Sequence, residues 1–150
     1  MKKSYIASAL AAAAVIMALV GCSGTANYND GTYTARSQEY VNNEDESVAG
    51  NGYGEVTLTI KDNKITDCTF VTYELDGTQK DENYGKENGE IKNKDFYNKA
   101  QKALAACEKY AQSLVEQGSL DGVDAISGAT INYNEFTEAV EEALKQAEAK

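Results

Sequence analysis

A seven-residue stretch near the C-terminus has residue types that suit the binding of a phosphate group. It reads Asp124-Ala125-Ile126-Ser127-Gly128-Ala129-Thr130 and comes shortly before a segment whose apolar residues have helical spacing. Gly128 has no Cβ, which lets the backbone lie close to a phosphate, and Ala129 keeps the approach to the Thr130 hydroxyl narrow and apolar. These residue types are compatible with a loop that lies close to a phosphate and presents the hydroxyl of Thr130.

The residues after this loop predict a helix start that favours an anion. Asn132-Tyr133-Asn134-Glu135 has the pattern of a capping box, with Asn132 as the N-cap and Glu135 reaching back from the third helical position. A helix start near Thr130 offers free backbone N–H groups and the positive end of the helix dipole. The alternative is that Ser-Gly-Ala-Thr is an ordinary turn that leads into a helix.

The spacing Asp-x-x-Ser-Gly-Ala-Thr resembles the flavin-attachment motif of the FMN-binding domain family. This family includes the flavinylated subunits of sodium-pumping quinone reductases and of their ferredoxin-linked relatives. In those proteins a separate flavin transferase joins the FMN phosphate to the last threonine as a phosphoester. The resemblance implies that Thr130 carries covalent FMN and that Asp124, Ser127, Gly128 and Ala129 belong to the binding motif.

Two further segments resemble parts of the same family. Asp30-Gly31-Thr32-Tyr33 is similar to its Asp-Gly-x-Tyr opening, and Gly52-Tyr53-Gly54 resembles a glycine-rich segment that lies near the flavin. The two glycines permit close approach of the backbone and the tyrosine suits contact with a flat ring, so all three are candidate cofactor-binding residues. The chain departs from the family in having no proline, whereas several members have a Thr-Pro-Gly element near residues 76–89.

The N-terminus resembles the signal peptide of a bacterial lipoprotein. Met1-Lys2-Lys3 is a short basic start, an apolar run follows from Tyr5 to Val20, and Gly21 precedes Cys22. The resemblance implies cleavage before Cys22 and lipidation of that cysteine, which places the chain on the extracytoplasmic face of the cell membrane. An uncleaved transmembrane anchor is the alternative, since the apolar run is only slightly short for a span.

The sequence therefore divides into a leader, a tether and one domain. We expect residues 1–21 to be the lipoprotein signal peptide, residues 22–30 the lipidated cysteine and a short tether, and residues 31–150 an FMN-binding domain. Ser23–Asp30 reaches only about 26–29 Å when fully extended, so the domain stays near the membrane. Loss of two lysines with the leader moves the formal charge from −10 to −12, which argues against nucleic acid as a partner.

The pattern of the remaining residues predicts an α+β domain. The predicted strands are Gly31–Arg36, Glu55–Lys61 and Ile65–Leu75, the last two joined by a tight turn at Asp62-Asn63. The predicted helices are Asp95–Gln117, which Gly118 ends, and about Tyr133–Ala147. We expect a small antiparallel sheet with both helices packed on one face.

The use of histidine and cysteine excludes several kinds of site. The chain has no histidine, which excludes Ser-His-Asp and Cys-His nucleophiles, histidine-ligated haem and the usual zinc sites. After lipidation of Cys22, Cys68 and Cys107 are too few thiolates for an iron–sulfur cluster. We expect these two cysteines to be buried packing thiols, with a disulfide between them as the alternative in an exported protein.

These features predict a membrane-anchored, extracytoplasmic flavoprotein. Its FMN on Thr130 would be attached by a flavin transferase and would relay electrons from a membrane redox donor to an extracytoplasmic acceptor. We expect no metal site, no catalytic residue and no substrate-turnover site of its own, because no convincing acid–base pair is visible. One alternative is an FMN-free envelope lipoprotein that binds a ligand or a partner, and another is a flavoenzyme with its own substrate.

Overall fold

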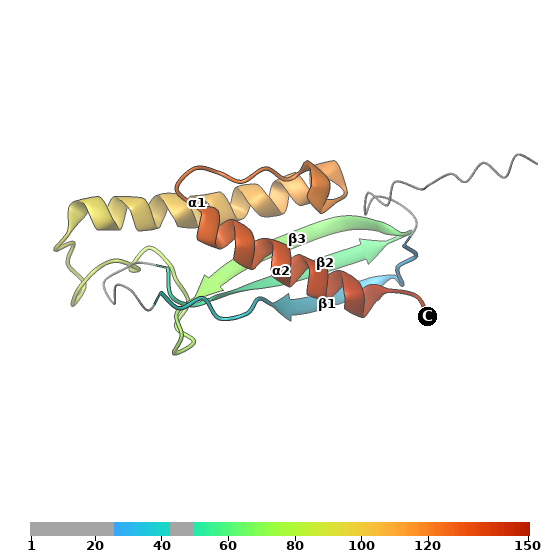
Figure 1. The fold of residues 1–150 in the computed structure, drawn as a ribbon, viewed down its shortest axis with the longest axis horizontal. Coiled ribbons are helices and arrows are strands. Elements are labelled where there is room, and N and C mark those ends of the chain that lie inside the picture. Colours follow the sequence, from blue (N-terminus) through green and yellow to red (C-terminus); the bar gives the residue numbers. More distant parts are fainter. Residues whose placement is uncertain (1–25, 43–49) are drawn as a thin grey trace, which may run out of the picture.

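The computed structural model describes residues 26–42 and 50–150, which form an antiparallel sheet covered on one face by two helices (Figure 1). The elements in chain order are β1 (Gly31–Arg36), β2 (Tyr53–Lys61), β3 (Lys64–Tyr73), α1 (Lys94–Gln117), the short 3₁₀ helix η1 (Leu120–Gly122) and α2 (Thr130–Ala147). The predicted α+β class is confirmed. The predicted leader and Cys22 lie outside the described residues, within which no helix is long and apolar enough to span a bilayer.

The sheet has β2 at its centre, paired antiparallel with β1 and β3. Alternate residues of β2 are buried, with Val56, Leu58 and Ile60 at most 1% exposed, because this face of the pleat meets the helices. Asp62 and Asn63 link β2 to β3 with φ values of 51° and 61°, as a type I′ hairpin turn requires. The predicted hairpin is therefore confirmed.

The two helices divide the sheet between them. α1 packs on β3, and α2 packs on β1 and β2 and also touches α1. Phe136 of α2 lies at the centre of the core, edge-on to Phe70 of β3 at 5.1 Å and stacked on Tyr110 of α1 at 5.7 Å between ring centroids. Asn93 caps the start of α1 by accepting a hydrogen bond from the Phe96 N–H, and Gly118 ends it with φ 74°.

The start of α2 differs from the prediction. The helix begins at Thr130 with Ala129 as its N-cap, so Asn132 and Glu135 are helical residues and the predicted capping box is wrong. Asn132 is buried and its side-chain amide donates to Cys107 Sγ at 3.3 Å, while Glu135 is buried at 3% exposure. The local pattern does not show that the helix starts three residues earlier and that both side chains are buried within it.

Candidate functional site

The Ser-Gly-Ala-Thr segment forms a tight turn that leads directly into α2. The Ala129 N–H donates to the Ile126 carbonyl at 3.0 Å, with Ser127 and Gly128 at the two central positions. Gly128 has φ 84°, the positive value that the third residue of a type II turn adopts. Thr130 is exposed and is the first residue of the helix, so its hydroxyl is accessible to an external enzyme.

A buried tyrosine fixes the backbone on both sides of this turn. The Tyr110 hydroxyl donates to the Ala129 carbonyl at 3.1 Å and accepts from the Ile126 N–H at 2.9 Å. Tyr110 belongs to α1 and is 1% exposed. The hydroxyl thus satisfies polar backbone groups of the turn and fixes its position relative to α1.

The start of α2 is open to an anion. Ala129 has no side-chain acceptor, and no side chain of the described residues caps the helix. The Tyr133 N–H donates to the Ala129 carbonyl. The backbone N–H groups that precede Tyr133 in the first turn of α2 have no acceptor within the helix, so they are available to an anion. A phosphate on the Thr130 oxygen would lie at the positive end of the helix dipole.

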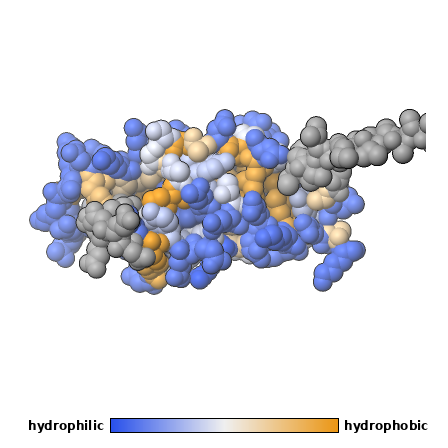
Figure 2. Space-filling view, viewed as in Figure 1, coloured by the Kyte–Doolittle hydropathy of each residue, from blue (hydrophilic) through white to orange (hydrophobic). Residues whose placement is uncertain are grey.

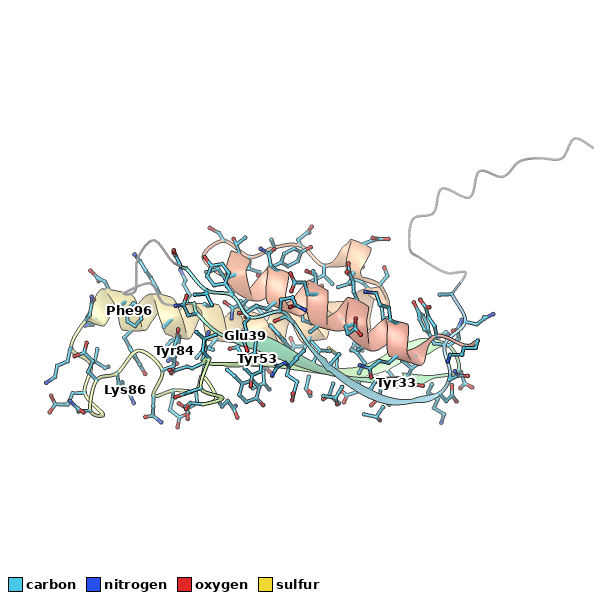
Figure 3. All side chains as sticks on the ribbon, turned by 60° about the horizontal axis from the view of Figure 1, so that its bottom comes forward. Tyr33, Glu39, Tyr53, Tyr84, Lys86 and Phe96 are labelled. Atoms are coloured by element: carbon cyan, nitrogen blue, oxygen red, sulfur yellow. The ribbon has the colours of Figure 1, made fainter. Side chains whose placement is uncertain are left out.

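A cleft of about 480 Å³ adjoins Thr130, within the range of about 300–1,000 Å³ that is usual for small-molecule sites. Its wall on α1 is mainly apolar, and its other walls come from the loop after β3 and from the start of α2. Figure 3 shows Phe96 of α1 and Tyr84 of the loop at the same end of the molecule, with Tyr33 at the opposite end. The lining residues are Gly50, Lys80, Tyr84, Phe96, Lys99, Ala100, Ala103, Leu104, Gly128, Ala129, Thr130, Ile131 and Asn132.

Hydrogen bonds from α1 hold the loop that forms one wall of the cleft. The Gln101 side-chain amide donates to the carbonyls of Asp81 and Tyr84 at 3.1 and 3.0 Å, and the Tyr97 hydroxyl donates to the Glu82 carbonyl at 2.9 Å. Figure 1 shows the loop running below the N-terminal half of α1, which extends beyond the sheet. The surface on the face seen in Figure 2 is mainly hydrophilic with separate hydrophobic patches.

Two ionisable side chains are buried beside the cleft. Lys80 lines it at 6% exposure, and its ammonium donates to the Gly50 carbonyl at 3.1 Å and lies 5.1 Å from the centre of the Tyr84 ring. Burial raises the pKa of the Glu135 carboxyl to about 7, although the positive charge of Lys80 acts in the opposite direction. Burial lowers the pKa of Lys80, and Glu135 opposes that change.

The structure separates the predicted site residues into three groups. Thr130, Ala129 and Gly128 line the cleft. Ser127 and Asp124 are exposed and are not among the lining residues. The glycine-rich segment at residues 52–54 also lies outside the lining and mostly within β2 rather than before it.

Tyr53 and its flanking glycines have packing roles that the sequence did not reveal. The Tyr53 ring faces the side of the sheet away from the helices, stacked on Tyr73 at 5.3 Å with the Arg36 guanidinium 4.6 Å from its centre. A Cβ at Gly52 would lie 1.9 Å from the Tyr73 carbonyl oxygen, and one at Gly54 would lie 2.5 Å from the Phe70 ring. Close contacts within the fold thus explain both glycines.

Sequence reasoning missed Tyr110, Lys80, Tyr84 and the burial of Glu135. Tyr110 had a detectable signal, because it lies three residues after Cys107 and four before Leu114 on the apolar stripe of α1. Lys80 and Tyr84 lie in an irregular polar loop, where no periodic pattern marks a buried residue. Only the tertiary structure shows that this loop folds against α1.

Both cysteines of the described residues are buried thiols, as predicted, and they are not joined in a disulfide. Burial raises the pKa of Cys68 to about 12 and that of Cys107 to about 11, so both remain protonated at neutral pH. Within residues 26–42 and 50–150, no group of acidic or cysteine side chains could hold a metal ion.

The fold is a small α+β domain with a mainly apolar cleft beside the uncapped start of α2. The family model of the FMN-binding domain matches residues 49–145. The chain therefore belongs to the FMN-binding domain family, as its motifs predicted, and it is a flavin-binding domain. The residues at the start of α2 and along the cleft fit FMN, since they supply free amides, a hydroxyl and an apolar wall.

A solved structure with a TM-score above 0.5 agrees with this fold. A crystal structure of a Clostridium perfringens protein has a TM-score of 0.56 and 20% identity, covering 80% of this chain and 88% of that one. A solution NMR structure of a Clostridium thermocellum protein has a TM-score of 0.40 and 26% identity, covering 79% and 91% of the two chains. No curated protein matches the chain.

Proposed function

We propose that this protein is a membrane-anchored, extracytoplasmic electron carrier whose FMN is joined by a phosphoester to Thr130. The observation that carries the proposal is the place of Thr130, an exposed hydroxyl at the uncapped start of α2 and in the lining of the cleft. A phosphate on this hydroxyl would have the first-turn amides as hydrogen-bond donors. When bound, the flavin supplies the redox chemistry.

The protein's own residues would bind and orient the cofactor. Tyr110 fixes the turn before Thr130 through its two backbone hydrogen bonds, so the attachment point stays in one position. Phe96 and Tyr84 supply aromatic surface to the cleft, and Ala100 and Ala103 leave room beside it. Lys80 adds a positive charge at the wall. These contacts would place a flat ring against α1.

The proposed partners follow from the proposed location. A flavin transferase would modify Thr130, a membrane redox donor would reduce the protein, and an extracytoplasmic acceptor would reoxidise it. Lipidated Cys22 would hold the domain at the membrane, within reach of such a donor. Covalent attachment suits this location because a dissociated cofactor would be lost from the cell envelope.

The attachment is tested by expressing wild type, Thr130→Ala, Thr130→Ser and Thr130→Val together with a flavin transferase. Wild type should keep flavin fluorescence after denaturation, and the alanine and valine variants should fold but lose it. The serine variant keeps a hydroxyl and should retain partial labelling. Flavin retained by denatured Thr130→Ala would contradict the attachment site.

The relay is tested by stopped-flow reduction of the labelled protein with an artificial donor, followed by reoxidation with a quinone or ferric acceptor. Labelled wild type should accept and release electrons reversibly, whereas Thr130→Ala should not. Fast, selective turnover of an organic substrate would instead place the protein among flavoenzymes.

A further inference from the structure

Two ionisable side chains, Lys80 and Glu135, are buried next to the cleft, and of the two only Lys80 has a side-chain hydrogen-bond partner among the described residues, the Gly50 carbonyl. Lys80 comes from the loop after β3 and lines the cleft, whereas Glu135 comes from α2 and lies behind the lining. They are 6% and 3% exposed. Each changes the pKa of the other, so their charges interact.

The start of β2 leaves space for both side chains. A Cβ at Gly52 would lie 2.9 Å from the Lys80 ammonium nitrogen, and a Cβ at Gly54 would lie 3.0 Å from Glu135 Cβ. The glycine-rich segment therefore makes room for this pair, in addition to its contacts with Tyr73 and Phe70.

The charge of Glu135 is poorly compensated. Neither carboxylate oxygen has a hydrogen-bond partner among the described residues, and Glu135 and Lys80 do not form a salt bridge within 4.0 Å. A buried carboxylate without donors is costly, so its protonated form is favoured relative to a carboxylate in water. A further negative charge nearby would favour protonation more strongly.

The other groups around Glu135 are poor candidates for proton exchange near neutral pH. Burial raises the pKa of Cys107 on α1 to about 11 and also raises that of Tyr84 in the loop. The remaining charged neighbours are Glu138 on α2, which disfavours ionisation of Glu135, and Glu74, which acts on Lys80. The face of β2 toward the helices carries Gly54, Val56, Leu58 and Ile60, none of which titrates.

We propose that Glu135, with Lys80 beside it, is the proton-exchanging group of the cleft and binds one proton when reduction adds negative charge there. This rests on the proposed function, which supplies two electrons from the membrane donor. The proton comes from water and forms one O–H bond on a Glu135 carboxylate oxygen. When the acceptor removes the electrons, that bond breaks and the proton returns to water.

The first test is the midpoint potential of the labelled protein as a function of pH, for wild type and Glu135→Gln. The exposed Glu141→Gln on the same helix is the control for the loss of one negative charge. One extra proton per two electrons makes the potential fall by about 30 mV more per pH unit. Wild type and Glu141→Gln should show this added slope in a window that starts near pH 7, and Glu135→Gln should lack it. Lys80→Met should move the window to higher pH.

The second test follows the Glu135 carboxyl carbon by NMR in Thr130→Ala, which carries no covalent flavin. Its midpoint should lie well above the value of about 4.3 that is usual for a glutamate in water, and Lys80→Met should raise it further. A Glu135 midpoint at that usual value would overturn the proposal, whatever the flavin does.

Intact mass separates the failure of this proposal from failure of the proposed function. A wild-type protein from a host with flavin transferase whose intact mass lacks the FMN increment would overturn both the proposed function and the role of Glu135. Labelled wild type whose potential changes with pH as in Glu135→Gln would overturn only the role of Glu135.

Discussion

The residues around Thr130 each have one identifiable physical task. Thr130 presents the hydroxyl, Gly128 adopts the positive φ of the turn, and Tyr110 holds the turn against α1. The sequence predicted Thr130 and Gly128 because a local motif contains them. It did not predict Tyr110, which lies 16 to 19 residues away from its partners along the chain and meets them only in the folded protein.

Tyr110→Phe should weaken both folding and labelling. Loss of the hydroxyl leaves the part-buried Ile126 N–H without its acceptor, which costs about 0.5–1.5 kcal/mol of unfolding free energy. Without the Tyr110 hydroxyl, the turn before Thr130 is no longer held against α1, so flavinylation of Thr130 should be slower. Denaturant unfolding and a time course of labelling measure the two effects. Tyr133→Phe, which removes one hydrogen bond to the Val123 carbonyl, is the control and should slow labelling less.

Asp124→Ala separates recognition from folding. Asp124 is exposed and makes no hydrogen bond or ion pair with the described residues, so its loss should change stability by about 0.5 kcal/mol or less. If the flavin transferase recognises the Asp124 carboxylate, the flavinylated fraction of Asp124→Ala should be lower than that of wild type. Full labelling together with lower stability would make Asp124 a turn residue only.

At the scale of elements, periodic patterns predicted most of the fold and failed where the core overrides local signals. The strands and α1 were located within about two residues, because alternation and helical spacing reflect burial on one face. The start of α2 was placed three residues late. Asn132 and Glu135 fit a capping box in sequence, but their side chains are buried by contacts with α1, β2 and the loop after β3, which no local pattern contains.

Two glycine variants test the difference between close packing and backbone conformation. Gly52→Ala should cost about 3 kcal/mol, because its Cβ would collide with the Tyr73 carbonyl in addition to the strain of its φ of 146°. Gly128→Ala has open space and should cost only about 1–2 kcal/mol, for its positive φ. Thermal unfolding of both variants measures this, and equal losses would contradict the packing explanation.

At the scale of the whole molecule, the cleft lies at one end of the domain, and residue 26, the first that the structure describes, lies at the other end. Tyr28 pairs with Glu148 beside the hairpin turn of β2 and β3, whereas the loop after β3, which contains Lys80 and Tyr84, lies at the opposite end of the sheet (Figure 1). If the chain is anchored through the segment before residue 26, as proposed, the cleft would lie at the end of the domain far from the anchor (Figure 1).

Cys22→Ser tests the proposed anchor. Without the thiol no lipid can be attached, so the protein should be lost from the membrane fraction or remain as uncleaved precursor. Fractionation and the mass of the N-terminal peptide measure this. An unmodified, internal Cys22 in wild type from its native host would favour a transmembrane anchor instead.

The intact mass of the exported wild-type protein, followed by peptide mapping, tests the central claim most directly. The predicted mass exceeds that of the lipidated chain by one FMN less one water, and the peptide that contains Thr130 carries the whole increment. A protein from a host with an active flavin transferase that lacks this increment, or carries it on another residue, would contradict the account.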